Sequence, residues 1–362
     1  MNITGRITGI KYKVHLADDL QKIEASAFNI NTVPTACIIN DGKHSFAISK
    51  WVSPKRTRSY PYERVYNTLN ISKKITVIPI VKDEGAKGDR DFIQWDTVSL
   101  MSLLDVFVIF AYYNEADKSE MKITTQKFNN KYVISKIKEI EQYHSSALHW
   151  NLNELNANLH NIIDKVKTSY AAIEKSTGVK LHGFRGLDNF KNKIGKDVSQ
   201  FMEFSRGKAE KAQSREFVTV QPKEILSTLT KAKITITNYL GGQYFFTVDE
   251  IKIAETLSLI EGKHTVNAVL PGKGDIKDGL LKMILYSNLS DTKVNGKKIK
   301  CKPILELTST KLKVGINSKS SAKGIENFFT TNNFNTVQKN LVTTLFIEAK
   351  SNNFTVNIKQ VK

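Results

Sequence analysis

Apolar and polar positions in the first part of the chain are spaced as in short strands and helices. Residues 35–52 read as two strands joined at Asp41-Gly42, a pair that favours a tight turn. Two runs of continuous apolar residues follow, each preceded by a short helical stretch, and such runs are typical of buried strands. We expect helices at 62–69 and 96–104 and strands at 74–81 and 105–113, within a mixed α/β segment over residues 1–130.

From residue 131 to residue 215 the apolar period lengthens to that of a helix. Residues 183–215 are rich in Lys, Gly and Ser with weak periodicity, which suggests a mobile or DNA-facing connection. The clearest helical face is formed by apolar residues three or four apart, namely Leu148, Leu152, Leu155, Leu159, Ile162 and Val166. The pattern predicts a helical segment over 131–215.

Residues 216–362 return to an α/β pattern, with strands that alternate apolar and polar positions. Their order is a helix, three strands, a helix and a strand, which is compact enough for a catalytic core. We expect helices at 222–232, 274–289 and 324–348, and strands at 233–240, 244–253, 256–264, 300–309 and 354–360.

The second and third of these strands form a hairpin in which two acidic residues face each other. We place its loop at residues 254–256, because this register sets every apolar residue of one strand opposite an apolar residue of the other. The expected pairs are Ile253 with Leu257, Ile251 with Leu259, and Asp249 with Glu261. A slip by one residue would put Glu250 opposite Glu261 and lose the apolar pairing.

Opposed carboxylates at about 5 Å repel each other by roughly 3 kcal/mol at an effective dielectric near 20. A sheet built only for stability would avoid this pair. A divalent cation bound between the two carboxylates would turn their repulsion into a net attraction. Mg²⁺ prefers carboxylate oxygens, which Asp249 and Glu261 would supply. Lys263 lies on the same face of the strand as Glu261, where it could orient or deprotonate an attacking water.

Asp249, eleven intervening residues and then Glu261-Gly262-Lys263 resemble the active-site signature of the PD-(D/E)XK nuclease superfamily. The resemblance covers about residues 216–310 and departs from the pattern at Val248, which stands in the place of a proline. It implies a restriction-endonuclease-like core, with a central mixed sheet flanked by helices, that cleaves phosphodiesters with Mg²⁺. Asp249 and Glu261 would be metal ligands and Lys263 the catalytic lysine, with Glu224 and Glu250 as possible accessory residues.

The charge of the chain favours a polyanionic partner. Lys and Arg number 54 against 35 Asp and Glu, a formal net charge of +19, and each phosphate that such residues neutralise releases counterions. Basic residues interleaved with tyrosines suit phosphate contact and base stacking. The candidate DNA-binding residues are Lys55, Arg56, Arg58, Tyr60, Arg64 and Lys277.

An acidic stretch at residues 83–96 is a rival metal site. It follows an apolar strand, but no Glu-x-Lys pattern comes after it, so an acidic turn with helix capping is the simpler interpretation. With only Cys37 and Cys301, neither a disulfide framework nor a multi-cysteine zinc site is expected. The chain shows no secretory signal and no apolar run of membrane-spanning length, so we expect a cytoplasmic protein.

Together these features predict a Mg²⁺-dependent DNA endonuclease, most simply a type II restriction enzyme that cuts double-stranded DNA at a specific sequence. A double-strand cut calls for two active sites, so a homodimer is expected, with a cognate DNA methyltransferase encoded nearby. Two alternatives stay open. One is a non-catalytic, basic nucleic-acid-binding protein, and the other is a nuclease of repair or phage defence.

Overall fold

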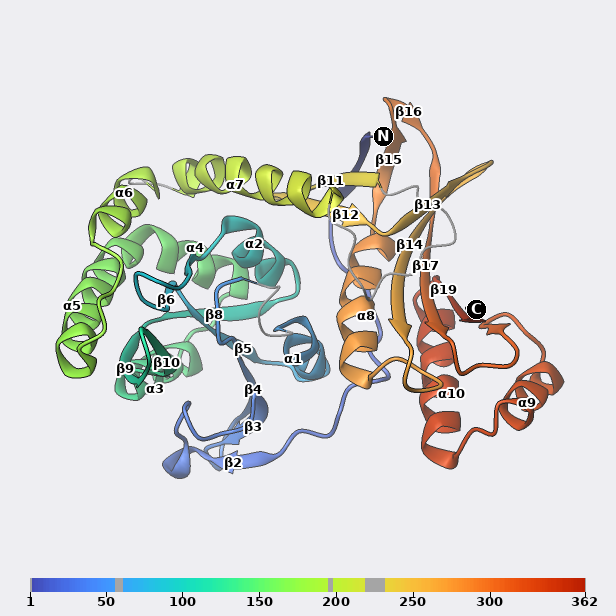
Figure 1. Cartoon of the computed structure of the whole chain (residues 1–362), viewed down its shortest axis with the longest axis horizontal. Coiled ribbons are helices and arrows are strands. Elements are labelled where there is room, and N and C mark those ends of the chain that lie inside the picture. The colour runs from blue at the N-terminus through green and yellow to red at the C-terminus, as the bar shows by residue number, and fades with distance from the viewer. Residues whose placement is uncertain (1, 56–60, 195–197, 219–231, 362) are drawn as a thin grey trace. The chain divides into compact units, whose positions relative to one another are not determined.

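The computed structural model of the chain describes residues 2–55, 61–194, 198–218 and 232–361 (Figure 1). The protein is mixed α/β, as the sequence predicted. It divides into two compact units, which we call the N-terminal unit (residues 19–207) and the C-terminal unit (residues 1–18 and 208–362). We had placed residues 1–130, 131–215 and 216–362 in separate segments. The first eighteen residues instead join the C-terminal unit, and the middle helices share a unit with the first α/β elements.

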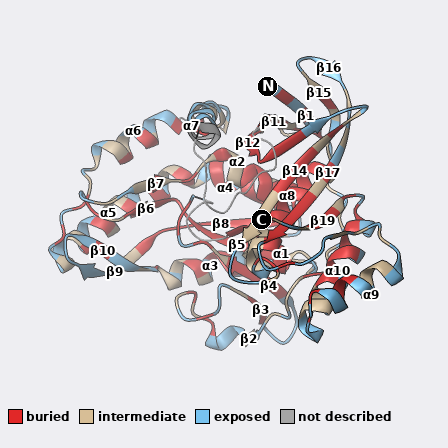
Figure 2. Ribbon diagram, turned by 45° about the vertical axis from the view of Figure 1, so that its right-hand side comes forward, coloured by how far each residue is buried: buried red, intermediate tan, exposed pale blue. Residues whose placement is uncertain are grey.

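A five-stranded sheet forms the centre of the N-terminal unit, in the order β2-β3-β4-β5-β8. The expected hairpin is present, since β3 and β4 pair antiparallel, and Gly42 in its turn has the positive φ of 85° that glycine tolerates best. β5 and β8 are buried along their whole length (Figure 2). The strands are β2 (Lys22–Glu24), β3 (Ala36–Asn40), β4 (Ser45–Lys50), β5 (Lys74–Pro79) and β8 (Val106–Ala111).

Helices pack around this sheet, and α4 shows how one of them is fixed in place. The Asn151 side chain accepts a hydrogen bond from Val108 N and donates one to Val106 O, so it mimics a neighbouring strand at β8. The helices of this unit are α1 (Pro61–Thr68), α2 (Trp95–Leu103), α3 (Asn130–Glu141), α4 (Ala147–Ala157), α5 (Leu159–Thr177) and α6 (Arg185–Ile194), and a short 3-10 turn spans Ala25–Ala27.

Within the stretch from 183 to 215, residues 185–194 and 198–215 are helical, which differs from the weakly periodic connection that the sequence suggested. The stretch contains α6 and most of α7 (Val198–Val218), and the boundary between the two units falls within α7. Leu187, Phe190 and Ile194 are buried at helical spacing on α6. The many Lys residues around them mask this apolar face in the sequence.

Two small antiparallel pairs complete the N-terminal unit. One is the ribbon formed by β9 (Tyr113–Ser119) and β10 (Lys122–Phe128). The other pairs β6 (Val81–Asp83) with β7 (Arg90–Phe92), and the acidic residues predicted as a rival metal site lie in and after this hairpin.

The C-terminal unit contains two five-stranded sheets. In the first, β1 pairs parallel with β11 although more than 200 residues separate them, and its elements are β12 (Gln243–Val248), β11 (Ala232–Asn238), β1 (Asn2–Ile7), β15 (Ser290–Val294) and β16 (Lys297–Lys298). The second runs in the order β13 (Glu250–Ile253), β14 (Thr256–Thr265), β17 (Lys300–Ser309), β19 (Thr355–Gln360) and β18 (Ile316–Asn317). β14 is antiparallel to β13 and parallel to β17.

Helix α8 (Lys273–Ser287) connects β14 towards β17 and packs against both strands (Figure 1). The helix expected at 324–348 is two helices, α9 (Ala322–Thr331) and α10 (Thr336–Ser351). The chain turns between them, where Asn333 has a positive φ of 54° and Asn335 caps α10 through its side chain. Asparagine tolerates a positive φ, and its side chain can cap a helix. The two asparagines therefore mark the end of one helix and the start of the next.

Residues 11–18 attach to the C-terminal unit through side chains that mimic backbone groups. Asn288 bonds to both the N–H and the C=O of Lys11, and Asn352 does the same at Lys13. The buried Glu348 carboxylate accepts hydrogen bonds from the Tyr12 hydroxyl and from two backbone amides of the segment, at His15 and Leu16. These contacts explain why the N-terminal residues belong to this unit.

Candidate active site

The hairpin of β13 and β14 has the register that the apolar pattern predicted. Ile253 pairs with Leu257, and Ile251 pairs with Leu259. Continued by one more pair of positions, this register sets Asp249 opposite Glu261, but the chain bends at Asp249 and the regular pairing ends at Glu250. The expected strand over 244–253 is therefore interrupted at Asp249, where the chain passes from the first sheet of the unit to the second.

The Asp249 side chain points at the peptide bond between Glu261 and Gly262. Its Oδ2 accepts a hydrogen bond from Gly262 N at 2.9 Å, and the residue is only 5% exposed. The carboxylate therefore lies beside the middle residue of the Glu261-Gly262-Lys263 sequence. A Cβ built at Gly262 would meet Asp249 Oδ2 at 3.8 Å, an ordinary van der Waals contact, so this hydrogen bond does not itself require glycine.

Glu261 is almost completely buried and is held by two lysines. Its Oε1 lies 3.0 Å from Nζ of Lys263, and its Oε2 lies 2.7 Å from Nζ of Lys282 on α8. Burial alone would raise the pKa of Glu261, but the charges of Lys282 and Lys263 outweigh burial and lower this pKa to about 2. The carboxylate is consequently ionised at neutral pH.

Lys263 connects the strand to the helix above it. Its Nζ donates to Oδ2 of Asp278 at 3.0 Å, in addition to the contact with Glu261. Burial would lower the pKa of Lys263, but the charges of Glu261 and Asp278 overcome it and raise this pKa. In this state Lys263 is an ammonium that can stabilise negative charge, and it is not a base that could deprotonate water.

Close approach of α8 to β14 depends on Gly279. A Cβ at this position would lie 2.8 Å from Leu305 Cδ1 and 3.3 Å from Lys263 Cε. With glycine, the turn of α8 that carries Asp278 and Lys282 sits directly over the Glu261 side chain. The network of Asp249, Glu261, Lys263, Asp278 and Lys282, which we call the β14–α8 network, reaches solvent mainly at Asp278 and Lys263.

The donor set of the network suits a hard cation, although it is not a ready-made metal cage. Carboxylate oxygens are the ligands that Mg²⁺ prefers, and Asp249 places its carboxylate at the amide of Gly262, the residue that follows Glu261. Within the described ranges, no three His, Cys, Asp or Glu side chains are grouped as a metal site would require. Mg²⁺ commonly takes one or two protein carboxylates and keeps several waters, so two acids are a sufficient protein contribution.

Two residues of the β14–α8 network, Asp278 and Lys282, were not predicted as catalytic or metal-binding residues, although Lys282, like Lys277, was a possible phosphate contact. They are four positions apart on α8 and so share one face of the helix. The sequence contains this spacing, with Gly279 between them. It does not show that this face covers β14, because that depends on the tertiary packing of α8.

Lys277 and Glu250 are placed where the predicted roles are not available to them. Lys277 was a candidate DNA contact, but its side chain is 0% exposed and its ammonium pairs with Asp18. Glu250 was a possible accessory residue, but it pairs across the sheet with Ile260 and so lies on the face opposite to Glu261. Its carboxylate is 3.2 Å from Nζ of Lys252. Both expectations are corrected by burial and strand alternation.

The structure describes only part of the predicted basic segment. Lys55 pairs with the buried carboxylate of Asp91 at 2.5 Å while its side chain stays 45% exposed. Arg64 on α1 donates from Nη1 to the Lys50 carbonyl at 2.7 Å, and burial lowers the pKa of its guanidinium. The remaining candidates, Arg56, Arg58, Tyr60 and the accessory Glu224, lie outside the described residues.

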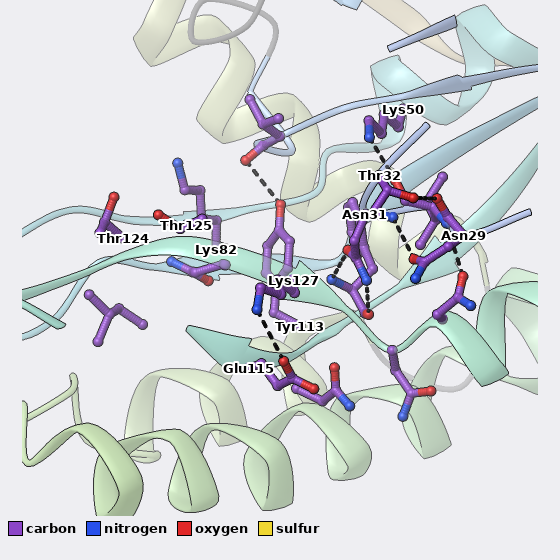
Figure 3. Close-up of a pocket in the computed structure, with 18 of the residues that line it drawn as sticks. Asn29, Asn31, Thr32, Lys50, Lys82, Tyr113, Glu115, Thr124, Thr125 and Lys127 are labelled. Atoms are coloured by element: carbon purple, nitrogen blue, oxygen red, sulfur yellow. Dashed lines mark hydrogen bonds and ion pairs between the residues drawn. The ribbon is translucent and has the colours of Figure 1, made fainter. Parts of the chain in front are cut away.

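A polar cleft of about 1280 Å³ lies in the N-terminal unit, next to the β9–β10 ribbon (Figure 3). Asn31 bonds to both backbone groups of Phe128, and Lys50 Nζ donates to the Ile30 and Val33 carbonyls. Figure 3 also shows Lys127 directed at Glu115, an ion pair of 3.4 Å. Because these polar groups bond to one another, their arrangement is explained by the packing of the loop around Asn31 on β10. We assign no ligand to the cleft.

Comparison with known proteins adds no relative to this picture, since no family model, no curated protein and no solved structure matches the chain. In the described part of the chain, none of the helices combines the length and the apolar character that crossing a membrane would require.

Proposed function

We propose that the protein is a Mg²⁺-dependent endonuclease that hydrolyses phosphodiester bonds of double-stranded DNA. The observation that carries the proposal is the convergence of Asp249, Glu261 and Lys263 on one short stretch of β14. Strand alternation and the register of the β13–β14 hairpin bring these three residues together, and their chemistry is that of the PD-(D/E)XK signature.

The order of elements supports the same proposal. β11, the bent pair β12 and β13, β14 and α8 follow one another along the chain, and β17, which is parallel to β14, comes after the short strands β15 and β16. Apart from β15 and β16, and with β11 and β12 in the first sheet of the unit, this is the succession of three strands, a helix and a strand that the resemblance implies. The helix expected before them, at 222–232, lies outside the described residues. A restriction-endonuclease-like core is therefore part of the proposal.

In this reaction the chain would position water and phosphate and supply charge. Asp249 and Glu261 would hold Mg²⁺, which would stabilise the negative charge that develops on the phosphate. Lys263 would direct its ammonium at the scissile phosphate or the attacking water, since its raised pKa keeps it protonated. In-line attack of water on phosphorus would form a new P–O bond and break the bond to the 3′ oxygen, and a proton of the water would pass through solvent to that departing oxygen.

Specific cutting of both strands extends the proposal to a type II restriction enzyme. Such an enzyme would act as a homodimer, would be cytoplasmic and would be encoded beside a cognate DNA methyltransferase. Its DNA contacts would come from the basic segment that begins at Lys55 and from Arg64, in a chain of formal net charge +19. A nuclease of repair or phage defence shares the chemistry but would not leave ends of a single sequence.

The competing proposal is a nucleic-acid-binding protein without catalysis. Its support is that the Glu261 carboxylate already has two ammonium partners, at 3.0 Å and 2.7 Å, so the network is electrostatically compensated without a metal. In that case the charged residues would stabilise the packing of α8 on β14. The two proposals differ in whether Mg²⁺ and DNA together produce cleavage.

Incubating plasmid DNA with the full chain, with Mg²⁺ or with EDTA, tests the proposal. We expect cutting only with Mg²⁺, and we expect Lys263→Ala to remove it while DNA affinity in gel shifts changes by no more than a few fold. Lys252→Ala is the matched control, because Lys252 also pairs with a buried glutamate but on the opposite face of the sheet. Undiminished cutting by Lys263→Ala would refute the catalytic assignment, and sequencing the ends would separate restriction from other nucleases.

A further inference from the structure

Lys282 holds one of the two carboxylate oxygens of Glu261. Glu261 offers two oxygens, of which Oε1 faces Lys263 and Oε2 faces Lys282 at 2.7 Å. The Lys282 side chain is 11% exposed, so its ammonium and the carboxylate meet away from bulk water. Ion pairs at such places are screened by salt much less than exposed pairs.

Two ammonium groups lie against the Glu261 carboxylate, and one of them, Lys263, is shared with Asp278. Lys263 and Lys282 together balance the charges of Glu261 and Asp278 in the metal-free protein. Lys282 therefore supplies a positive charge where the proposed mechanism calls for a divalent cation. Cations this close repel each other, so an ion binding at Oε2 requires the ammonium to move away.

We propose that Lys282 takes the place of the divalent cation at Oε2 of Glu261 in the metal-free protein and that a DNA phosphate helps to release it. The inference rests on the proposed function and deepens it. An incoming phosphate offers the ammonium a new anionic partner, and Glu261 Oε2 then becomes available to the cation. Metal and DNA would thus each strengthen the binding of the other, as thermodynamic linkage requires.

Binding of Mn²⁺, measured from the electron paramagnetic resonance signal of the free ion, tests this without relying on activity. If the Lys282-occupied state is populated about 90% of the time, removing it strengthens apparent affinity about tenfold. We therefore expect Lys282→Met to bind Mn²⁺ about tenfold more tightly than the wild type in the absence of DNA. Lys282→Arg, which keeps the charge, should bind with nearly wild-type affinity.

Lys252→Met is the matched control, because it removes a lysine partner of a buried glutamate on the opposite face of the same hairpin. It should leave Mn²⁺ affinity unchanged. Adding Glu261→Gln to Lys282→Met should abolish the gain, which locates the bound ion at this carboxylate. Near-UV circular dichroism of each variant verifies that the fold is retained.

A second arm adds DNA fragments that the wild-type protein has already digested to completion, so that no further cleavage occurs. These fragments should strengthen Mn²⁺ binding to the wild type and have a much smaller effect on Lys282→Met. Equal or weaker Mn²⁺ binding by Lys282→Met, together with plasmid cutting by the wild type, would overturn the role of Lys282 alone. Absence of both Mn²⁺ binding and cutting in all proteins would overturn the proposed function as well.

Discussion

The β6–β7 hairpin and the β14–α8 network both bury carboxylates beside cations, but they do so in different ways. In the hairpin, Asp83 accepts a hydrogen bond from Gly85 N at 2.9 Å and lies 2.8 Å from Nδ1 of His182. In the network, Glu261 meets lysines that come from β14 and from α8. The first arrangement closes a turn onto its neighbours, whereas the second gathers charge from separate elements.

The difference indicates which acidic cluster is the better catalytic candidate. Asp91, the second buried acid of the hairpin, pairs with Lys55 and accepts from the Ser53 hydroxyl, so both buried acids of this hairpin fasten segments of the N-terminal unit. In the network Asp249 binds the amide of Gly262, between Glu261 and Lys263, and Glu261 binds Lys263. The acids of the hairpin have no such Glu-x-Lys neighbour, so the β14–α8 network is the better candidate.

The largest contrast is expected when one acid of each cluster is changed to its amide. Glu261→Gln should lower the rate of plasmid cleavage about 10³-fold, the upper range for removing one electrostatic group of an active site. Asp83→Asn should leave cleavage close to wild type and lower the free energy of unfolding by about 1–3 kcal/mol, because it disturbs buried hydrogen bonds. Cleavage rates and urea unfolding of the two variants measure both effects. The reverse outcome would move the active site to the hairpin.

Only part of the β14–α8 network could be predicted from the sequence. The register of the β13–β14 hairpin followed from the sequence because strand alternation is local and one face is apolar, as the Ile251–Leu259 pair shows. Asp278 and Lys282 were not found because the face that α8 presents to β14 depends on packing, which includes the fit of Gly279 against Leu305. The same limit hid β1, whose partner β11 is distant in sequence.

Acid should shift the unfolding equilibrium of the wild type about a hundredfold more than that of Glu261→Gln. The pKa of Glu261 is lowered to about 2 in the folded protein, against about 4.3 in an unfolded chain. Its contribution, about 3 kcal/mol, is therefore complete above the unfolded pKa and is lost as the pH falls towards 2. Urea unfolding between pH 6 and pH 2.5 should show a smaller loss for Glu261→Gln than for the wild type.

Glu115→Gln is the control for the acid experiment, because Glu115 is an exposed carboxylate whose side chain is 64% accessible. It should follow the wild-type dependence on pH. If Glu261→Gln also followed it, then Glu261 would not be held as a carboxylate by its lysines, and the contrast between the two clusters would lose its electrostatic basis.

Disturbing the close approach of α8 to β14 should lower the rate of plasmid cleavage about tenfold. Gly279→Ala places a methyl group 2.8 Å from Leu305 Cδ1 and 3.3 Å from Lys263 Cε, so the Leu305 side chain must move and the Lys263 side chain is displaced from its position. A displacement of this kind at a positioned group costs on the order of tenfold or more in rate. Gly207→Ala on α7 is the matched control, since a Cβ there meets nothing within 4 Å. Equal cleavage rates for the two variants would show that the helix does not position the site.

Lys55 pairs with an acid of the β6–β7 hairpin and is also a candidate DNA contact. Its substitution should give the smallest effect. It pairs with Asp91 of the hairpin, yet its side chain is 45% exposed in a segment predicted to contact DNA. If it also contacts a phosphate, Lys55→Met should weaken DNA binding by a few fold and reduce the salt dependence by about one counterion. Gel shifts over a series of salt concentrations measure this, with Lys252→Met as the control for loss of one charge. An unchanged salt slope would assign Lys55 to the hairpin alone and leave DNA contact to other basic residues.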